Sequence, residues 1–260
     1  MNGLETAVAG WRGLSGRWAV RLSSYPIVRE SMTTKPIHEV KIHSWYIDPK
    51  EYARHENRRG KRHAYQTIKA SSTALVVVDM IPFFVNENPY CRGIIPNIAR
   101  LASTLRAAGG SIVWALPAVE NRVSDVKREF FGDKVADMYN QSAGSGSLSD
   151  RIWHEFDVMP GDIIIEKSSS SAFFPGYSPL HSILQKNNID TVLITGTVTN
   201  VCCESSARDA RELGYRVIMV ADANAAVSDQ SHNATLHTIY RSFGDVRPTE
   251  EVLGLFASEN

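Results

Sequence analysis

The chain has 260 residues, of which 43% are hydrophobic, and 28 Lys and Arg side chains balance 28 Asp and Glu side chains. This length and composition are typical of a globular protein that buries a sizeable core, and the zero net charge provides no positive field that would collect nucleic acid or anionic lipid. No apolar stretch reaches the roughly eighteen residues that cross a bilayer, so no membrane partner is expected. The three cysteines are an odd number without CxxC spacing, which argues against a disulfide framework.

The first 70 residues differ in character from the rest. We predict an N-terminal extension and arm over residues 1–70, partly disordered, and one domain over residues 71–260. The opening residues have no compact apolar segment after a basic start, which makes a poor secretory signal, so a cytoplasmic protein is expected. Met32 is a candidate for the true start of the chain.

A polar, basic segment at 41–70 contains the run RRGKR. This run could bind phosphate, but no other basic surface extends it, and a solvated arm that wraps a neighbouring subunit is the preferred interpretation. Trp45, Tyr46 and Tyr52 would then be anchors against that neighbour. We therefore expect a homo-oligomer.

From Thr73 onward, apolar β-rich runs alternate with segments of helical periodicity. The strand-like runs lie at 73–80, 111–116, 162–167, 192–194 and 216–221. The helix-like segments lie at 97–108, 179–187, 202–213 and 231–243, while 120–139 is helical or irregular. Repeated β-α units predict an α/β fold with a doubly wound, mostly parallel sheet and helices on both faces.

Cys202 is the most informative single residue. An apolar strand that breaks at Gly196 delivers it to the first turn of a helix. A thiol at that place lies near unpaired backbone N–H groups and the positive end of the helix dipole, which favours the thiolate. Free cysteine is also among the most buried residue types, so the position alone leaves a structural role open. Of the adjacent pair, Cys203 fits the structural role better because its side chain points to a different side of the helix.

Two further strand-like runs end in a charged side chain. Asp79 lies at the end of the first run and Lys167 at the end of the run at 162–167. Because ligands of open parallel sheets bind outside the carboxyl ends of the strands, a carboxylate, an amine and a thiol are predicted at one rim. The three side chains are chemically complementary, so together they are more informative than each charge taken alone.

The segments LVVVDM, EKSSSSAFF and GTVTNVCCESSARDA, in this order, resemble the three catalytic segments of the isochorismatase-like cysteine hydrolases. That superfamily includes nicotinamidases, N-carbamoylsarcosine amidases, and ureidoacrylate and biuret hydrolases. The resemblance covers about Ser72 to the C-terminus and implies a Rossmann-like three-layer fold. It also implies Cys202 as the nucleophile, Asp79 as the general acid/base and Lys167 as the third member of a triad.

The same resemblance implies further features of the site. The peptide between Thr197 and Val198 is expected to be cis, with the backbone N–H groups of Val198 and Cys202 forming an oxyanion hole. The implied activity is hydrolysis of a C–N amide-type bond of a small molecule through a cysteine thioester, with no cofactor.

The chain departs from this family at two places. Nicotinamidases carry an aspartate and histidines after the second strand that bind a metal, whereas WALPAVENRVSD has no histidine here, so no catalytic metal is expected. The frequent DMQ-x-DF appears as DMIPFF, which makes the entrance more apolar and suits an amide or lactam with a ring. Each candidate pocket aromatic is equally well explained as a core residue. The candidates are Phe83, Phe84, Trp114, Phe173, Phe174 and Tyr177.

Three other interpretations remain at this point. The chain could be a small-molecule-binding member of the fold that has lost turnover. It could be an isochorismatase that cleaves a vinyl ether, although that chemistry needs no thiol. His232 and Asp222 could form a Cys–His–Asp arrangement, but Asp79 already supplies a base at a strand end, so a core role for His232 is preferred.

Overall fold

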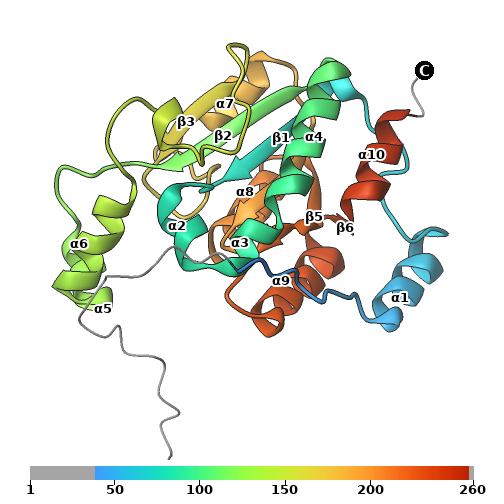
Figure 1. Cartoon of the computed structure of the whole chain (residues 1–260). Coiled ribbons are helices and arrows are strands. Elements are labelled where there is room, and N and C mark those ends of the chain that lie inside the picture. The colour runs from blue at the N-terminus through green and yellow to red at the C-terminus, as the bar shows by residue number, and fades with distance from the viewer. Residues whose placement is uncertain (1–38, 258–260) are drawn as a thin grey trace, which may run out of the picture. The chain divides into compact units, whose positions relative to one another are not determined.

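The computed structural model describes residues 39–257, and the predictions about Met32 and about the extension before residue 39 lie outside this range. Six parallel strands form one sheet in the order β3-β2-β1-β4-β5-β6 (Figure 1). The strands are β1 (Thr73–Val78), β2 (Ser111–Pro117), β3 (Ile163–Lys167), β4 (Thr191–Thr197), β5 (Arg216–Ala225) and β6 (Asp245–Arg247). The helices are α1 (Pro49–Arg59), α2 (Pro82–Glu87), α3 (Pro89–Gly93), α4 (Ile95–Ala107), α5 (Asp125–Phe131), α6 (Asp133–Ser142), α7 (Leu180–Lys186), α8 (Glu204–Glu212), α9 (Asp229–Ser242) and α10 (Thr249–Ala257).

The strand order confirms the predicted doubly wound fold. The chain starts in the middle of the sheet, builds outward through β2 to β3, then returns to the other side of β1 and builds outward again through β4, β5 and β6. The direction of winding therefore reverses between β1 and β4. In open α/β sheets this switch point leaves a crevice at the carboxyl ends of the strands, where ligands bind.

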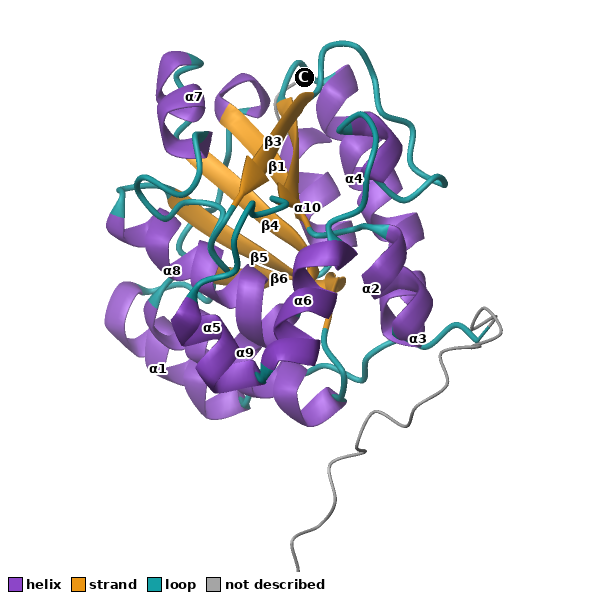
Figure 2. Cartoon of the chain, turned by 90° about the vertical axis from the view of Figure 1, so that its left-hand side faces the viewer, coloured by secondary structure: helices purple, strands orange, loops and turns teal. Residues whose placement is uncertain are grey.

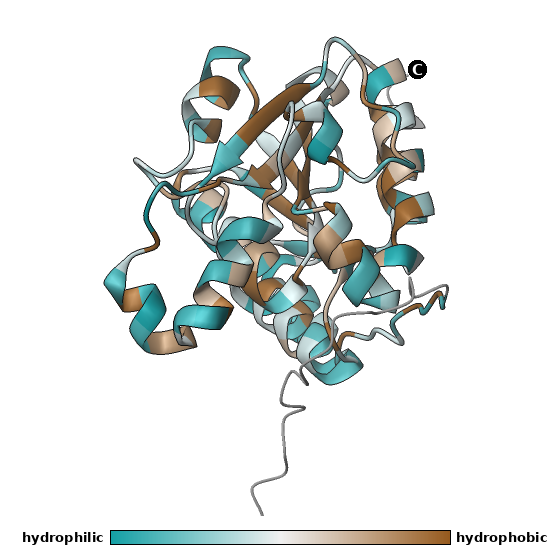
Figure 3. Cartoon of the chain, turned by 60° about the vertical axis from the view of Figure 1, so that its left-hand side comes forward, coloured by the Kyte–Doolittle hydropathy of each residue, from teal (hydrophilic) through white to brown (hydrophobic). Residues whose placement is uncertain are grey.

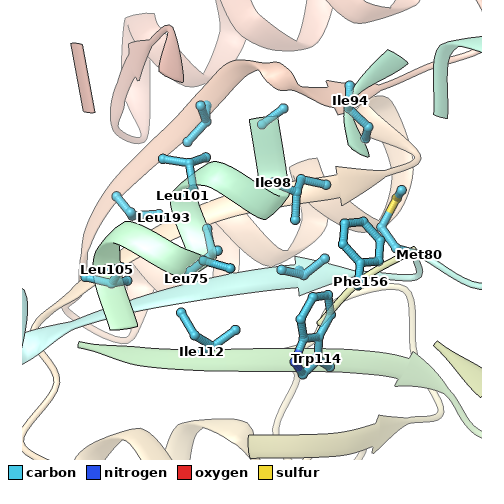
Figure 4. Close-up of a cluster of buried hydrophobic side chains, with 14 of the residues drawn as sticks. Leu75, Met80, Ile94, Ile98, Leu101, Leu105, Ile112, Trp114, Phe156 and Leu193 are labelled. Atoms are coloured by element: carbon cyan, nitrogen blue, oxygen red, sulfur yellow. The ribbon is translucent and has the colours of Figure 1, made fainter. Parts of the chain in front are cut away.

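Two hydrophobic clusters cover the two faces of the sheet, which Figure 2 shows between its helix layers. The first cluster joins the strands to α4 and α10, and Figure 4 shows Ile98, Leu101 and Leu105 of α4 lying over Leu75 of β1. The second cluster contains residues of α7, α8 and α9. Because both faces are covered, the central parts of the long strands are apolar, and these parts are brown in Figure 3.

Gly196 allows β1 and β4 to approach each other at the switch point. Its φ is +109°, and a Cβ atom built there would lie 2.1 Å from the Val78 carbonyl oxygen. An L side chain is excluded both by the backbone conformation and by this contact. The strand break that the sequence places at Gly196 is therefore required for the pairing of the two strands that flank the crevice.

Residues 39–70 pack against the same chain, which corrects the interpretation of this segment as an arm anchored on a neighbouring subunit. The ring of Tyr52 packs edge-on against Tyr240 of α9, with centroids 5.1 Å apart, and Trp45 packs against the same hydrophobic cluster. The backbone N–H groups of Ala64 and Tyr65 donate to the Asp245 carboxylate of β6. Only Tyr46 is largely exposed among the three expected anchors. The sequence misled because the apolar contacts are few and widely spaced in a polar stretch.

The basic run in this segment is also used internally. The Arg59 guanidinium donates to the carbonyl groups of Lys61 and Arg62 and lies 3.6 Å from Asp245. The Arg62 guanidinium pairs with Glu56 and lies over the Tyr52 ring. These contacts oppose a phosphate-binding role.

Among the helices that the structure describes at 39–257, none combines the length and the hydrophobicity that a membrane span requires.

Helices α5 and α6 form a hairpin that stands beside the carboxyl ends of the strands (Figure 1). Its base is closed by the Asn140 side chain, which accepts from the Glu120 backbone N–H and donates to the Glu120 carbonyl. The buried Arg151 guanidinium donates to the Pro117 and Ala143 carbonyls, one at each end of the hairpin segment. One side chain therefore holds the hairpin to the sheet.

Candidate active site

Asp79 and Lys167 meet at the carboxyl end of the sheet. Lys167 is the last residue of β3, and Asp79 follows β1 in a left-handed conformation with φ of 53°. The Lys167 ammonium donates to Asp79 Oδ2 at 2.9 Å, with side-chain exposures of 3% and 2%, and also donates to the Ser169 carbonyl at 3.2 Å. Asp79 Oδ1 is buried without a hydrogen-bond partner among the described residues. The carboxylate therefore keeps one free acceptor atom inside the site.

Cys202 lies in a π-helical turn, Thr199–Cys203, that connects β4 to α8. The Val198 carbonyl accepts from the N–H groups of Val201 and Cys203, and the Ser206 hydroxyl donates to the Cys202 carbonyl at 2.6 Å. The helix proper begins only at Glu204. The sequence predicts the thiol in the first turn of the helix, whereas the structure places it in a wider, π-helical turn just before that helix.

One cavity of about 500 Å³ joins the three predicted catalytic residues. Asp79, Lys167 and Cys202 all line it, and so does Val198. The Thr197–Val198 peptide is cis, as the family resemblance implied. Val198, the residue after this peptide bond, and Cys202 therefore line the same space.

The two charges in this cavity shift the pKa of the Cys202 thiol in opposite directions. Burial and the Asp79 carboxylate raise the pKa of Cys202 to about 12, while Lys167 acts to lower it. The expectation that the helix start would favour the thiolate is therefore outweighed by burial. Burial also opposes the charged form of Lys167, but the Asp79 carboxylate and Cys202 outweigh it and hold the pKa of Lys167 above its ordinary value. The thiol is therefore protonated at neutral pH, and any reaction of the thiolate requires a base.

The other two cysteines are in the core. Cys203 is 0% exposed, and burial raises its pKa well above the ordinary value. Cys91 is also 0% exposed, and its thiol donates to the Thr197 hydroxyl at 3.3 Å. Cys202 alone among the three lines the cavity with Asp79 and Lys167.

The predicted pocket aromatics need correction. Phe84 lines the cavity, but Trp114 does not, because it lies in the core against Phe156 and its indole N–H donates to Asp162. Phe173 is buried at 1% exposure beside Tyr215. Phe174 and Tyr177 pack against each other in an exposed loop outside the cavity lining. Phe83 packs against the core cluster.

The cavity wall that the sequence missed comes from the α5–α6 hairpin. Phe130, Phe131 and Tyr139 line the cavity together with Phe84 of α2. Tyr139 contacts both Phe83 and Phe131 edge-on. The signal in the sequence was the aromatic pair inside 120–139, which a search limited to strand ends does not reach.

Polar groups complete the cavity but do not make a metal site. Ser168, Ser169 and Ser170 line it beside Lys167, and Glu120 pairs with Lys127 on the hairpin side. Within residues 39–257, no group of three or more His, Cys, Asp or Glu side chains is placed to hold a metal ion.

His232 and Asp222 do not form a triad with Cys202. Asp222 accepts hydrogen bonds from the backbone and hydroxyl of Thr249. His232 is fully buried and forms a hydrogen bond with the Thr199 hydroxyl at 2.9 Å. The preferred core role of His232 is consistent with this burial.

Comparisons with known proteins show which family this chain belongs to. An isochorismatase domain model matches residues 73–251. YwoC, an isochorismatase family protein of Bacillus subtilis, is 33% identical over 190 residues, which cover 72% of this chain and 95% of YwoC. The ureidoacrylate amidohydrolase RutB of Agrobacterium fabrum is 29% identical over 219 residues, covering 74% of this chain and 92% of RutB. The crystal structure of a cysteine hydrolase from Pseudomonas syringae matches with a TM-score of 0.64 at 26% identity, covering 76% of this chain and 98% of that one. The chain belongs to the isochorismatase family.

Proposed function

We propose that the protein is a cysteine hydrolase that cleaves a C–N amide-type bond of a small molecule through a thioester on Cys202. The observation that carries this proposal is the buried Asp79–Lys167 pair, 2.9 Å between Oδ2 and Nζ, in the same cavity as the Cys202 thiol. A buried carboxylate with one free acceptor oxygen is the group that a protonated thiol needs. The names of the relatives, an amidohydrolase and a cysteine hydrolase, support this reaction class.

The first half of the reaction forms the thioester. Because the pKa of Cys202 is raised to about 12, the thiol is protonated at neutral pH, and its proton moves to Asp79 as the sulfur attacks the carbonyl carbon. The negative charge that develops on the carbonyl oxygen is met by the N–H groups of Val198 and Cys202. The C–N bond then breaks, and Asp79 returns the proton to the leaving nitrogen, which departs as ammonia or an amine.

The second half regenerates the enzyme. Water donates a proton to Asp79 while its oxygen attacks the thioester carbon, the C–S bond breaks, and the proton returns to the sulfur as the acid leaves. Lys167 keeps its positive charge throughout, because its pKa lies above the ordinary value, and it compensates the carboxylate whenever Asp79 is ionised. No step in this scheme requires a cofactor.

The cavity walls support a substrate with an apolar part. Phe84, Phe131 and Tyr139 form an apolar part of the cavity lining. An amide or lactam with a ring can place its carbonyl at Cys202 and bury the ring among these side chains, whereas a small urea would leave that surface uncovered.

The experiment that tests the proposal is a screen of amides, lactams, ureas and carbamoyl compounds, read out by release of ammonia or amine. Cys202→Ala is expected to abolish turnover of every substrate that the wild type hydrolyses. Cys203→Ala, the same chemical change one residue away in the core, is the matched control and is expected to keep activity. Turnover by Cys202→Ala at the wild-type rate would refute the thioester mechanism.

A further inference from the structure

A stack of three flat rings lies next to the turn Thr199–Cys203, which we call the nucleophile turn because it contains Cys202. The His43 ring lies between the Tyr90 ring, at a centroid distance of 3.9 Å and an interplanar angle of 2°, and the His232 ring, at 4.2 Å and 8°. The three rings come from the segment before α1, from α3 and from α9. His43 is thereby a spacer that fixes the distance between two helices on either side of it.

His43 is held in one orientation. The Ala226 backbone N–H donates to its Nε2 at 3.0 Å, so its Nδ1 carries the hydrogen that is donated to Asp229 Oδ1 at 2.6 Å. Burial lowers the pKa of His43, against the opposing effect of Asp229, which agrees with a neutral ring that donates at one nitrogen and accepts at the other. The side chain is only 3% exposed.

His232 connects the fixed His43 ring to the nucleophile turn. Its Nδ1 is 2.9 Å from the Thr199 hydroxyl, and both residues are fully buried. Thr199 is the first residue of the turn that ends at Cys203, and it directly follows Val198, whose N–H is assigned to the oxyanion hole. A second hydrogen bond from the same helix, from the Thr235 hydroxyl to Glu204, holds the other end of the turn.

We propose that His43 is a positioning residue for the oxyanion hole, acting through His232 and Thr199 on the Val198–Cys202 backbone. The inference rests on the proposed function, since it assumes that an oxyanion forms there. The isochorismatase domain model begins at residue 73, so this residue is supplied by a segment outside the matched domain. Removal of the His43 ring would leave His232 without its stacking partner, so the Thr199 end of the turn would be held less firmly.

Two chemical probes of the same sulfur separate positioning from general damage. With p-nitrophenyl acetate, the Cys202 sulfur attacks the ester carbon, Asp79 takes the thiol proton, and p-nitrophenolate leaves, so an oxyanion forms on the way to the acetyl thioester. With iodoacetamide, Asp79 again takes the thiol proton and the sulfur displaces iodide from a saturated carbon, so no oxyanion forms. Only the first reaction depends on the Val198 and Cys202 N–H donors.

The test compares both rate constants in full-length variants, with the labelled residue identified by peptide mass. His43→Ala is expected to slow acetylation of Cys202 at least about tenfold, because small displacements of catalytic groups have large effects on rate, while alkylation by iodoacetamide changes less than about threefold. Thr199→Val, which removes the hydroxyl at nearly constant shape, is expected to show the same pattern. The double variant is expected to be no slower than the slower single variant, because both changes break one chain of contacts.

His55→Ala is the matched control. His55 is another buried histidine of the segment before residue 70, and it also packs on an aromatic ring of α9, 4.9 Å from Tyr240, with its Nε2 3.1 Å from the Tyr240 carbonyl oxygen. It lies toward the other end of α9, away from Thr199, so its removal is expected to lower stability while acetylation stays within about threefold.

Several outcomes would overturn the proposal. Acetylation by His43→Ala and Thr199→Val within threefold of wild type would do so, as would equal slowing of both probes, an equal loss in His55→Ala, or multiplicative losses in the double variant. If His43→Ala does not fold, Thr199→Val and the control carry the same comparison. Wild-type reaction of both probes with Cys202→Ala would instead show that the proposed nucleophile is wrong.

Discussion

Replacing Asp79 by Asn tests the buried ion pair through stability as well as through activity. The substitution keeps the shape of the side chain but leaves the Lys167 ammonium buried without a counter-ion. At 2.9 Å and an effective dielectric constant of about 20, the attraction between the two charges is about 6 kcal/mol. Removing one partner of a buried pair typically costs about 3–5 kcal/mol, so we expect a loss of free energy of unfolding of about that size at pH 7.

The pH dependence of this loss has a definite sign. In the wild type the pKa of Lys167 is raised, so its contribution to stability is fully present below the unfolded value of 10.5 and is lost only as pH rises through the higher folded value. In the variant, burial acts without Asp79 and lowers the pKa of Lys167 below that of the unfolded chain. The unfolded state then binds more protons, so the variant recovers stability relative to the wild type as the pH rises from 7 toward 10.

The assay is urea unfolding followed by tryptophan fluorescence at pH 7 and pH 9.5. Glu120→Gln is the control, because it makes the same chemical change in the ion pair between Glu120 and Lys127. This pair lines the same cavity, but the Lys127 side chain is 44% exposed. That change is expected to cost less than about 1 kcal/mol. Equal losses in the two variants, or a deficit of Asp79→Asn that grows with pH, would refute the reasoning.

Three further predictions concern the cavity, the switch point and metals. A ring-bearing amide such as benzamide should exceed biuret at least about tenfold in kcat/KM, because about 60 Å² of additional buried apolar area is worth near 1.5 kcal/mol. Phe131→Ala should reduce that ratio, and equal kcat/KM values for the two substrates would count against the aromatic wall. Gly196→Ala should lower the free energy of unfolding in urea by more than about 3 kcal/mol. Gly214→Ala, also at positive φ but with open space around the added Cβ, should lower it by about 1–2 kcal/mol, and similar losses would show that the contact with Val78 does not matter. Dialysis against a chelator should leave turnover unchanged, and recovery of lost activity with zinc would contradict this.

The strand ends were the part of the site that the sequence could predict. Asp79, Lys167 and Cys202 each follow an apolar run, and parallel strands bring their carboxyl ends to one edge, so their meeting follows from the fold class. The prediction that Trp114 lines the pocket was wrong for a related reason. Strands buried on both faces show no alternation, and the pattern therefore does not tell which side chains face the core.

Residues outside the sheet were harder to predict. The aromatic wall formed by Phe131 and Tyr139 lies in a hairpin whose packing depends on long-range contacts with Arg151 and Pro117, and these leave no periodic signal. His43 is one of three histidines in the polar segment at 41–70, and its proposed role depends on two rings that are distant in sequence, Tyr90 and His232. Local patterns carry no information on such contacts.

Trapping the covalent intermediate tests the central claim most directly. A substrate found in the amide screen is mixed with the enzyme and quenched in acid within the first turnover, and the intact mass and the peptide masses are measured. The account predicts a mass increase equal to the acyl part of the substrate, located on the peptide that contains Cys202 and absent in Cys202→Ala. An acyl group on another residue, or turnover by Cys202→Ala at the wild-type rate, would contradict it.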